Sequence, residues 1–259
     1  MTDLGNVAFV YPGSATSYAG LGKDLFQLFP QLYVDFSEIV SDFHRFVWSD
    51  YTFPKKINTS DTTPEFYDNV VAMMSTGVFF SGMWTKVLTK YFKINPDLVF
   101  GYSMGECSSM LYSSGVWHPG HTLLFQNSPI FTKRFAGDLE LLAETWGIST
   151  EEAKKRWVGL AVLAPRSEVE ALVNQSENVY LTFINTENEV VISGDRKVCE
   201  YIVKVLKCQS VELPFQNVIH HDFCKKESDG LLKMHGFPVE EKPNFDFFSS
   251  LTLQRMNLD

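Results

Sequence analysis

The chain has 259 residues, of which 45% are hydrophobic and 20% are charged, and its formal net charge is -9. These proportions are typical of a globular protein that can bury a core as one large domain or two small ones, and they exclude a disordered chain. The sequence is acidic overall and has no block of like charges. We therefore expect neither nucleic acid nor an anionic membrane as its main partner.

The cysteines and the amino terminus bear on the cellular compartment. Cys107, Cys199, Cys208 and Cys224 have no CxxC spacing and form no zinc-like group with histidine. This pattern is typical of reduced thiols in a cytoplasmic protein, and we expect no metal site. The first residues lack the basic start and long apolar core of a signal peptide, and no apolar run is long enough to cross a bilayer.

The first predicted strand, Asn6–Val10, is followed by a glycine-containing loop and by a helix that begins near Gly20. A loop in this position can present backbone N–H groups to an oxyanion. It is not a P-loop, because no G-K-[ST] follows. We next expect a helix over Phe29–Val47, a surface loop over Trp48–Thr63 and buried helices over Pro64–Tyr91.

The segment Asp97–Ser113 has the strongest functional pattern. An apolar run is followed by Gly101-Tyr102-Ser103-Met104-Gly105 and then by helical spacing. Strand, G-x-S-x-G and helix in this order predict a nucleophile elbow. The glycines let strand and helix approach closely, and the helix directs its first N–H groups toward the serine. The alternative interpretation is a Gly/Ser turn that matches the pattern by chance.

Beyond a helix expected around His121–Arg134, the middle of the chain has a different pattern. Six elements are predicted there, in the order strand, helix, strand, strand, helix, strand: Val158–Ala164, Arg166–Asn174, Val179–Asn185, Glu189–Ser193, Asp195–Leu206 and Ser210–Pro214. The order β-α-β-β-α-β is the ferredoxin-like unit. Its position predicts a subdomain over residues 136–214, inserted into a core formed by residues 1–135 and 215–259.

The chain returns from this insertion with Phe215–Cys224. We expect a helix after Lys225 and then a strand over Asn244–Ser249. We expect the larger domain to be incomplete at its carboxyl end, whether the chain is a truncated piece or a minimal natural protein. Four histidines outside these segments are expected at the surface or in turns: His44, His118, His121 and His235.

Three segments together resemble the malonyl-CoA/acyl-CoA:acyl-carrier-protein transacylases of fatty acid and polyketide synthases. Gly101–Glu106 matches the G-H-S-x-G-E of that family, with Tyr102 in place of histidine. Tyr11–Ala15 lies where the family has P-G-Q-G, and Asn185–Gly194 resembles its N-x-P-x-x-x-V-x-S-G segment without the proline.

Further segments most resemble the acyltransferase subunit of bacterial polyunsaturated fatty acid synthases: Phe9–Gly13, Ser128–Gly137 and Ile219-His220. The resemblance covers nearly the whole chain. It implies an α/β fold in which an α/β-hydrolase-like core with a parallel sheet carries the inserted ferredoxin-like α+β subdomain, with the active site in the cleft between them.

The resemblance also implies a catalytic base. The catalytic histidine of the family lies after the inserted subdomain, which makes His220 its match. A serine nucleophile needs a base, and an imidazole suits that task, so His220 would take the proton from Ser103. The backbone amides of Met104 and Ser14 are the candidates for an oxyanion hole. His221 is the rival base, but adjacent residues of an extended segment point to opposite sides, so only one of the two can face the serine.

One difference from the family pattern bears on whether the acyl group is charged. Members that use malonyl groups carry an arginine whose position falls near Ser128-Pro129 here, and neither residue is basic. Arginine is the side chain suited to bidentate carboxylate binding, so its absence points to an uncharged acyl group. Arg134 is the nearest alternative, and its competing interpretation is an ordinary surface charge.

We therefore expect an acyltransferase that moves an acyl group from coenzyme A through Ser103 to the phosphopantetheine thiol of an acyl carrier protein, with no permanently bound cofactor. A thioesterase on the same site is the second enzymatic interpretation, and a non-catalytic module that docks the carrier protein is the alternative from another class. Lys154-Lys155-Arg156 and Lys225-Lys226 could contact an acidic carrier or other synthase subunits, or could simply be solvated charges.

Overall fold

The computed structural model describes residues 5–39, 48–52 and 63–258. It divides into two compact units, one from Met1–Asn127 with Met234–Asp259 and one from Ser128–Lys233. The second unit therefore includes short segments on both sides of residues 136–214. His44 and most of the expected loop Trp48–Thr63 lie outside the described residues.

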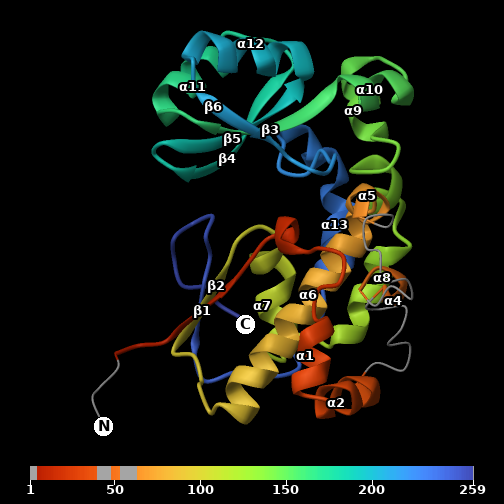
Figure 1. Cartoon of the computed structure of the whole chain (residues 1–259), viewed down its shortest axis with the longest axis vertical. Coiled ribbons are helices and arrows are strands. Elements are labelled where there is room, and N and C mark those ends of the chain that lie inside the picture. The colour runs from red at the N-terminus through yellow and green to blue at the C-terminus, as the bar shows by residue number, and fades with distance from the viewer. Residues whose placement is uncertain (1–4, 40–47, 53–62, 259) are drawn as a thin grey trace. The chain divides into compact units, whose positions relative to one another are not determined.

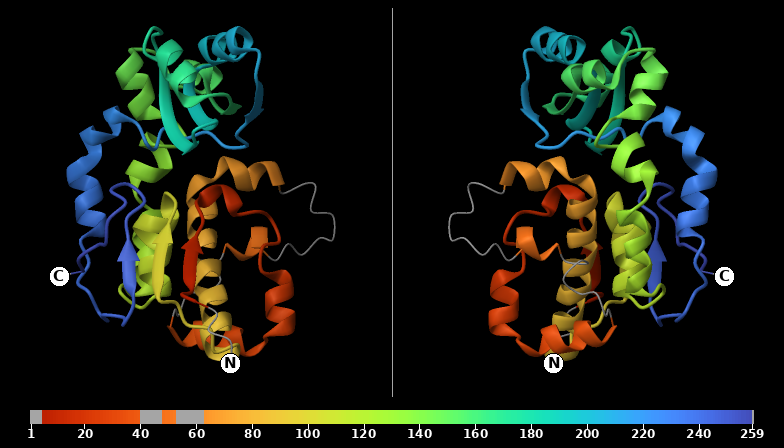
Figure 2. Two further views of the ribbon diagram at one scale, coloured as in Figure 1. Left: turned by 90° about the vertical axis from the view of Figure 1, so that its left-hand side faces the viewer. Right: turned by 90° about the vertical axis from the view of Figure 1, so that its right-hand side faces the viewer.

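The first unit contains a parallel sheet of three strands: β1 (Ala8–Tyr11), β2 (Leu98–Gly101) and β7 (Asp246–Phe248). Their order is β1-β2-β7, and Figure 2 shows them side by side. Both outer strands pair with β2 in parallel, so the turn after β2 lies at the carboxyl edge of the sheet. The two terminal strands predicted from the sequence are confirmed.

The helices of this unit that carry labels in Figure 1 include α1 (Lys23–Leu28), α2 (Gln31–Ile39), α4 (Ser49–Thr52), α5 (Thr63–Asp68), α6 (Val70–Lys86) and α7 (Met110–Ser113). The helix α6 is buried on most of its surface, as a helix that is apolar all round must be. The Asn69 side chain caps it by accepting a bond from the Ala72 N–H at 3.0 Å. The helix α4 lies within the segment that the sequence predicted as a loop.

Two of the segments expected to be helical contain π turns. Residues Val87–Tyr91 and Gly105–Ser109 form π turns rather than regular α-helix. The expected helix around His121–Arg134 is divided into a 3-10 turn, α8 (Leu123–Gln126) and a third π turn over Ile130–Arg134. The break coincides with Pro129, because proline disfavours helical backbone in the residue before it.

The second unit contains an antiparallel sheet of four strands: β3 (Trp157–Leu163), β4 (Val179–Thr186), β5 (Glu189–Asp195) and β6 (Gln209–Glu212). The order β4-β5-β3-β6 is that of a ferredoxin-like unit, so this prediction is confirmed. The helices α11 (Arg166–Val173) and α12 (Arg196–Leu206) lie on one face of the sheet (Figure 1). Their buried side chains share one apolar core with β3 and β5.

Two helices precede this sheet, and one follows it: α9 (Glu140–Trp146), α10 (Thr150–Arg156) and α13 (Ser228–His235). Between β6 and α13 the chain forms a loop and a 3-10 turn over Asp222–Glu227. This loop contains both candidate bases. Within the described ranges, no helix is long and apolar enough to cross a membrane.

Candidate active site

The backbone of Ser103 is strained. Its φ of 54° lies in the left-handed region, which costs a residue other than glycine about 1–3 kcal/mol. Hydrogen bonds hold the turn: the Tyr102 N–H donates to the Tyr11 carbonyl at 2.9 Å, and the Gly105 N–H donates to the Tyr102 carbonyl at 2.9 Å. The Glu106 N–H donates to the Ser103 carbonyl at 3.0 Å. The local geometry is thus that of the sharp elbow predicted from the sequence.

The two glycines of the motif are required by close backbone contacts. A Cβ on Gly101 would lie 2.1 Å from the carbonyl carbon of Gly105. A Cβ on Gly105 would lie 2.0 Å from the carbonyl oxygen of Tyr11. Any side chain at either position would overlap backbone atoms, which cannot move aside without shifting the elbow.

The loop after β1 lies beside this elbow. A Cβ on Gly13 would be 3.0 Å from the Tyr102 ring and 3.4 Å from its carbonyl oxygen. The loop is anchored at Ser17, whose hydroxyl donates to the Met73 carbonyl of α6 at 2.8 Å. The candidate oxyanion donors, the backbone N–H groups of Ser14 and Met104, therefore belong to neighbouring segments of one unit.

The carboxylate of Glu106 connects the elbow to the chain after β7. The Ser249 hydroxyl donates to Oε1 at 2.5 Å, and the Ser250 N–H donates to Oε2 at 3.0 Å. The Ser250 hydroxyl also bonds to Oε2. No pattern around Glu106 in the sequence predicts this contact, because its partners lie more than a hundred residues away.

His220 belongs to the second unit, and its backbone is also in the left-handed region, at a φ of 73°. Its ring lies 4.6 Å from that of Phe183 on β4. Although the residue as a whole is exposed, protein atoms around the imidazole desolvate it and lower its pKa from the ordinary value. A neutral imidazole near pH 7 is the form that can accept a proton.

The loop that carries His220 is fixed on each side of it. The Trp157 indole N–H donates to the Asn217 carbonyl at 2.9 Å. The Val218 N–H donates to the Phe135 carbonyl at 2.8 Å, and the Cys224 thiol donates to the Val218 carbonyl at 2.8 Å. These bonds hold the backbone of the loop against the rest of its unit.

His221 is enclosed by aromatic rings and is only 8% exposed. Its ring stacks on Phe223, with centroids 5.0 Å apart. The rings of Trp157 and Tyr180 pack against it in edge-on, T-shaped geometry, with centroids 5.1 and 5.0 Å away. Neither ring nitrogen has a hydrogen-bond partner among the described residues. Burial lowers the pKa of His221 to about 3, with the nearby His220 adding to the effect. This environment favours His220 over His221 as the candidate base.

Arg134 is held by three hydrogen bonds to glutamates of its own unit. Its Nη1 and Nη2 donate to the two carboxylate oxygens of Glu144 at 2.7 and 3.0 Å, and its Nε donates to Glu227 at 2.5 Å. A substrate carboxylate would have to displace these partners. The structure therefore argues against the substrate-binding role considered for Arg134, and in favour of an ion pair that fixes the Ile130–Arg134 turn.

The remaining described histidines contact aromatic rings. His121 stacks on Phe237 with centroids 4.1 Å apart, and His235, which ends α13, lies 4.9 Å from Phe125. His118, His121 and His235 are all half-buried. Within residues 5–39, 48–52 and 63–258, no three metal-ligating side chains are grouped to hold an ion.

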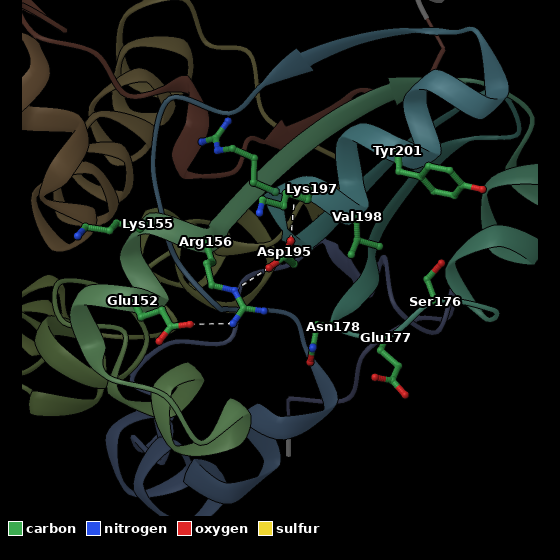
Figure 3. Close-up of a pocket in the computed structure, with 11 residues that line it drawn as sticks. Glu152, Lys155, Arg156, Ser176, Glu177, Asn178, Asp195, Lys197, Val198 and Tyr201 are labelled. Atoms are coloured by element: carbon green, nitrogen blue, oxygen red, sulfur yellow. Dashed lines mark hydrogen bonds and ion pairs between the residues drawn. The ribbon is translucent and has the colours of Figure 1, made fainter.

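An open pocket of about 820 Å³ lies on the second unit, between α10, α12 and the loop before β4 (Figure 3). Arg156, from the basic cluster noted in the sequence, bonds there to Glu152 at 3.0 Å and to Asp195 at 2.7 Å. Lys154 of the same cluster pairs with Asp138 at 2.8 Å. Acidic side chains of the chain itself thus neutralise much of the cluster, which weakens it as a surface for an acidic partner.

No family model matches the sequence. The chain is 26% identical, over 96% of its length, to a polyunsaturated fatty acid synthase component from Thraustochytrium sp., and it spans 13% of that protein. It is 22% identical, over 88% of its length, to the malonyl CoA-acyl carrier protein transacylase of Bacillus subtilis, and it spans 67% of that protein.

The fold has close counterparts among solved structures. The crystal structure of a malonyl-CoA:acyl carrier protein transacylase from Xanthomonas oryzae pv. oryzae matches with a TM-score of 0.73 at 16% identity, over 97% of this chain and 75% of the other. The α/β fold with a parallel sheet and a small antiparallel subdomain, expected from the sequence, is confirmed. The chain is therefore similar in sequence, over most of its length, to these two proteins, and it shares the fold of the malonyl-CoA:acyl carrier protein transacylases.

Proposed function

We propose that this chain is an acyltransferase that takes an acyl group from coenzyme A onto Ser103 and passes it to the phosphopantetheine thiol of an acyl carrier protein. The observation that carries the proposal is the strained backbone of Ser103 between two glycines that admit no side chain. Strain of this kind persists only where the surrounding structure enforces it, and it gathers at functional sites.

The first half of the reaction forms the acyl-enzyme. His220 accepts the hydroxyl proton of Ser103 as Oγ attacks the thioester carbonyl carbon. Backbone N–H groups of Met104 and Ser14 stabilise the negative charge of the tetrahedral intermediate. The carbon–sulfur bond then breaks, and the coenzyme A thiolate takes the proton from His220.

The second half repeats these steps with the carrier thiol as nucleophile. The thiol gives its proton to His220 and attacks the seryl ester, and Ser103 leaves and recovers the proton. The chain's own residues supply every catalytic group in these two reaction steps, so the proposed reaction needs no resident cofactor. The similarity to part of a large synthase supports a carrier protein and other synthase subunits as partners.

The test is the intact mass of the protein after incubation with a panel of acyl-CoAs. We expect one acyl group to be added to the wild type and none to Ser103→Ala. Cys107, in the turn that follows, provides the matched control, because Cys107→Ala should be acylated like the wild type. Neutral hydroxylamine separates the two residues chemically, since it cleaves a thioester and leaves an oxygen ester in place.

Replacement of the base gives a second readout. His220→Ala should slow acylation by about two to four orders of magnitude, the usual contribution of a general base. Acylation that persists unchanged in Ser103→Ala would contradict the proposal. Release of the free acid faster than transfer to a carrier would identify a thioesterase instead, and a wild type that no acyl-CoA modifies would favour a non-catalytic module.

A further inference from the structure

His221 is a buried titratable residue that the proposed reaction does not use. Its flat ring lies among Trp157, Tyr180 and Phe223, which we call the aromatic cage. No described residue bonds to either ring nitrogen, so the side chain contributes packing and no hydrogen bond. A polar ring is an unusual filling for an apolar site, which raises the question of what its position achieves.

The aromatic cage is itself rigidly supported. Trp157 is 1% exposed, and its indole N–H is bound to the Asn217 carbonyl. The Tyr180 hydroxyl accepts a bond from the Trp146 indole N–H at 3.1 Å. Two walls therefore come from strands of the antiparallel sheet, and the third, Phe223, stacks on His221 from two residues further along the loop.

His220 lies between two anchored residues. Val218 on its amino side is fully buried and bonded to Phe135, and His221 on its carboxyl side is held by the cage. His220 itself has left-handed backbone, whereas His221 is extended, with a φ of -124°. The buried ring thus fixes the point at which the chain must turn, and the imidazole of His220 lies against Phe183 of β4.

We propose that His221 is a positioning residue, whose ring in the aromatic cage holds the left-handed turn that orients the imidazole of His220. This inference rests on the proposed role of His220 as base. It follows that the shape of the side chain matters and its nitrogens do not. A phenyl ring should fill the same space, whereas a methyl group should release the turn.

Kinetics of acylation test this directly. His221→Ala should lower kcat by about 10²-fold with little change in KM, because misplacing a catalytic group by about 1 Å has an effect of that size. His221→Phe should remain within about threefold of the wild type. Phe223→Ala removes one wall of the cage and leaves both histidines in place, so it should also lower kcat, as His221→Ala does.

A control separates positioning from stability. Val169 is fully buried in the apolar core shared by α11, α12, β3 and β5, a core to which no cage residue belongs, so Val169→Ala should destabilise the unit without lowering kcat at a temperature well below its melting point. Equal kcat values for His221→Ala and Val169→Ala under those conditions would overturn the inference, as would a loss in His221→Phe as large as in His221→Ala.

Histidine NMR gives a readout that does not depend on catalysis. In the wild type and in His221→Phe, the His220 Cε1–H resonance should titrate with the same lowered pKa. In His221→Ala that pKa should move toward the value of a free histidine. A wild type that no acyl-CoA modifies contradicts the proposed function and leaves this measurement valid, whereas an unchanged His220 titration in His221→Ala contradicts the positioning role alone.

Discussion

The carbonyl oxygen of Tyr11 lies 2.0 Å from the position that a Cβ on Gly105 would occupy. The first strand and the helix after the elbow are therefore in backbone contact, with only hydrogen atoms of a glycine between them. Because Tyr11 also accepts the Tyr102 N–H, the same carbonyl group fixes both the position of the elbow and the start of the candidate oxyanion loop.

This contact predicts that Gly105→Ala destabilises the first unit by about 3 kcal/mol or more, since the new methyl group overlaps backbone rather than a flexible side chain. Acylation of Ser103 should be lost as well. Gly82→Ala in α6 is the matched control: the nearest atoms are 3.8 Å from its Cβ position, so it should be neutral or stabilise by up to about 1 kcal/mol. Chemical denaturation measures both, and equal stabilities for the two variants would contradict the prediction.

Removal of the Glu106 carboxylate should release the chain after β7 from the elbow. Three hydrogen bonds are lost, but two of them come from Ser250, which is exposed, so water replaces part of what they contribute. Since one bond to a charged group contributes about 1.5–3 kcal/mol, we expect Glu106→Ala to cost about 2–4 kcal/mol in the free energy of unfolding. Asp24→Ala, which removes an exposed carboxylate from the first turn of α1, should cost less than about 1 kcal/mol. Thermal denaturation of the two variants compares them, and matching losses would show that the Glu106 contact contributes little.

These contacts show which parts of the structure the sequence could predict. Local patterns in the sequence predict both the elbow and the ferredoxin-like unit. Glycines beside a serine predict the elbow, and apolar residues that alternate over short strands predict the unit. The π turns at Gly105–Ser109 and Ile130–Arg134 are not predictable in this way, because a single wide turn leaves no separate signal in hydrophobic spacing.

The partners of charged and aromatic side chains were also beyond the sequence. Glu106 meets Ser249 across 143 positions of the chain, and Arg134 meets Glu227 across 93. His221 is more buried than His220 because its ring packs against Trp157 and Tyr180, which lie on other elements of the unit. The sequence predicts that only one of the two histidines faces the serine. The surroundings of each ring favour His220 as that residue.

The aromatic cage predicts a pH dependence of stability. The folded-state pKa of His221 is about 3 and its unfolded value is about 6.5, so below pH 6.5 the unfolded chain binds a proton that the folded chain does not. Its contribution is therefore intact above pH 6.5 and declines by about 1.4 kcal/mol per pH unit as the pH falls toward 3. The neighbouring His220 has a lowered pKa and acts with the same sign, while Asp222 opposes the shift.

His221→Phe should remove the pH-dependent contribution of His221 to stability, because a phenyl ring does not titrate. Between pH 7 and pH 5 the wild type should lose about 2 kcal/mol more than His221→Phe in urea denaturation monitored by tryptophan fluorescence. Parallel loss in the two proteins over this range would show that His221 is protonated in the folded state and that the cage does not exclude the charge.

The last prediction concerns the acyl group. A malonyl thioester brings a carboxylate to the site, and an unpaired carboxylate out of water costs several kcal/mol. The position near Ser128-Pro129, where the resemblance implies an arginine, has no basic residue. The nearest arginine, Arg134, already holds Glu144 and Glu227 and would have to exchange these partners for the substrate.

We therefore expect acetyl or longer uncharged acyl-CoAs to be preferred over malonyl-CoA by roughly 10- to 100-fold, which corresponds to the loss of about 1.5–3 kcal/mol from one charged hydrogen bond. Competition between acetyl-CoA and malonyl-CoA for Ser103, measured by mass spectrometry, gives the ratio. Arg134→Ala should destabilise the second unit, because Glu144 and Glu227 lose their shared partner, and should leave that ratio unchanged. If malonyl-CoA wins in the wild type and Arg134→Ala erases its advantage, then Arg134 binds the substrate carboxylate and its glutamate partners are displaced on binding.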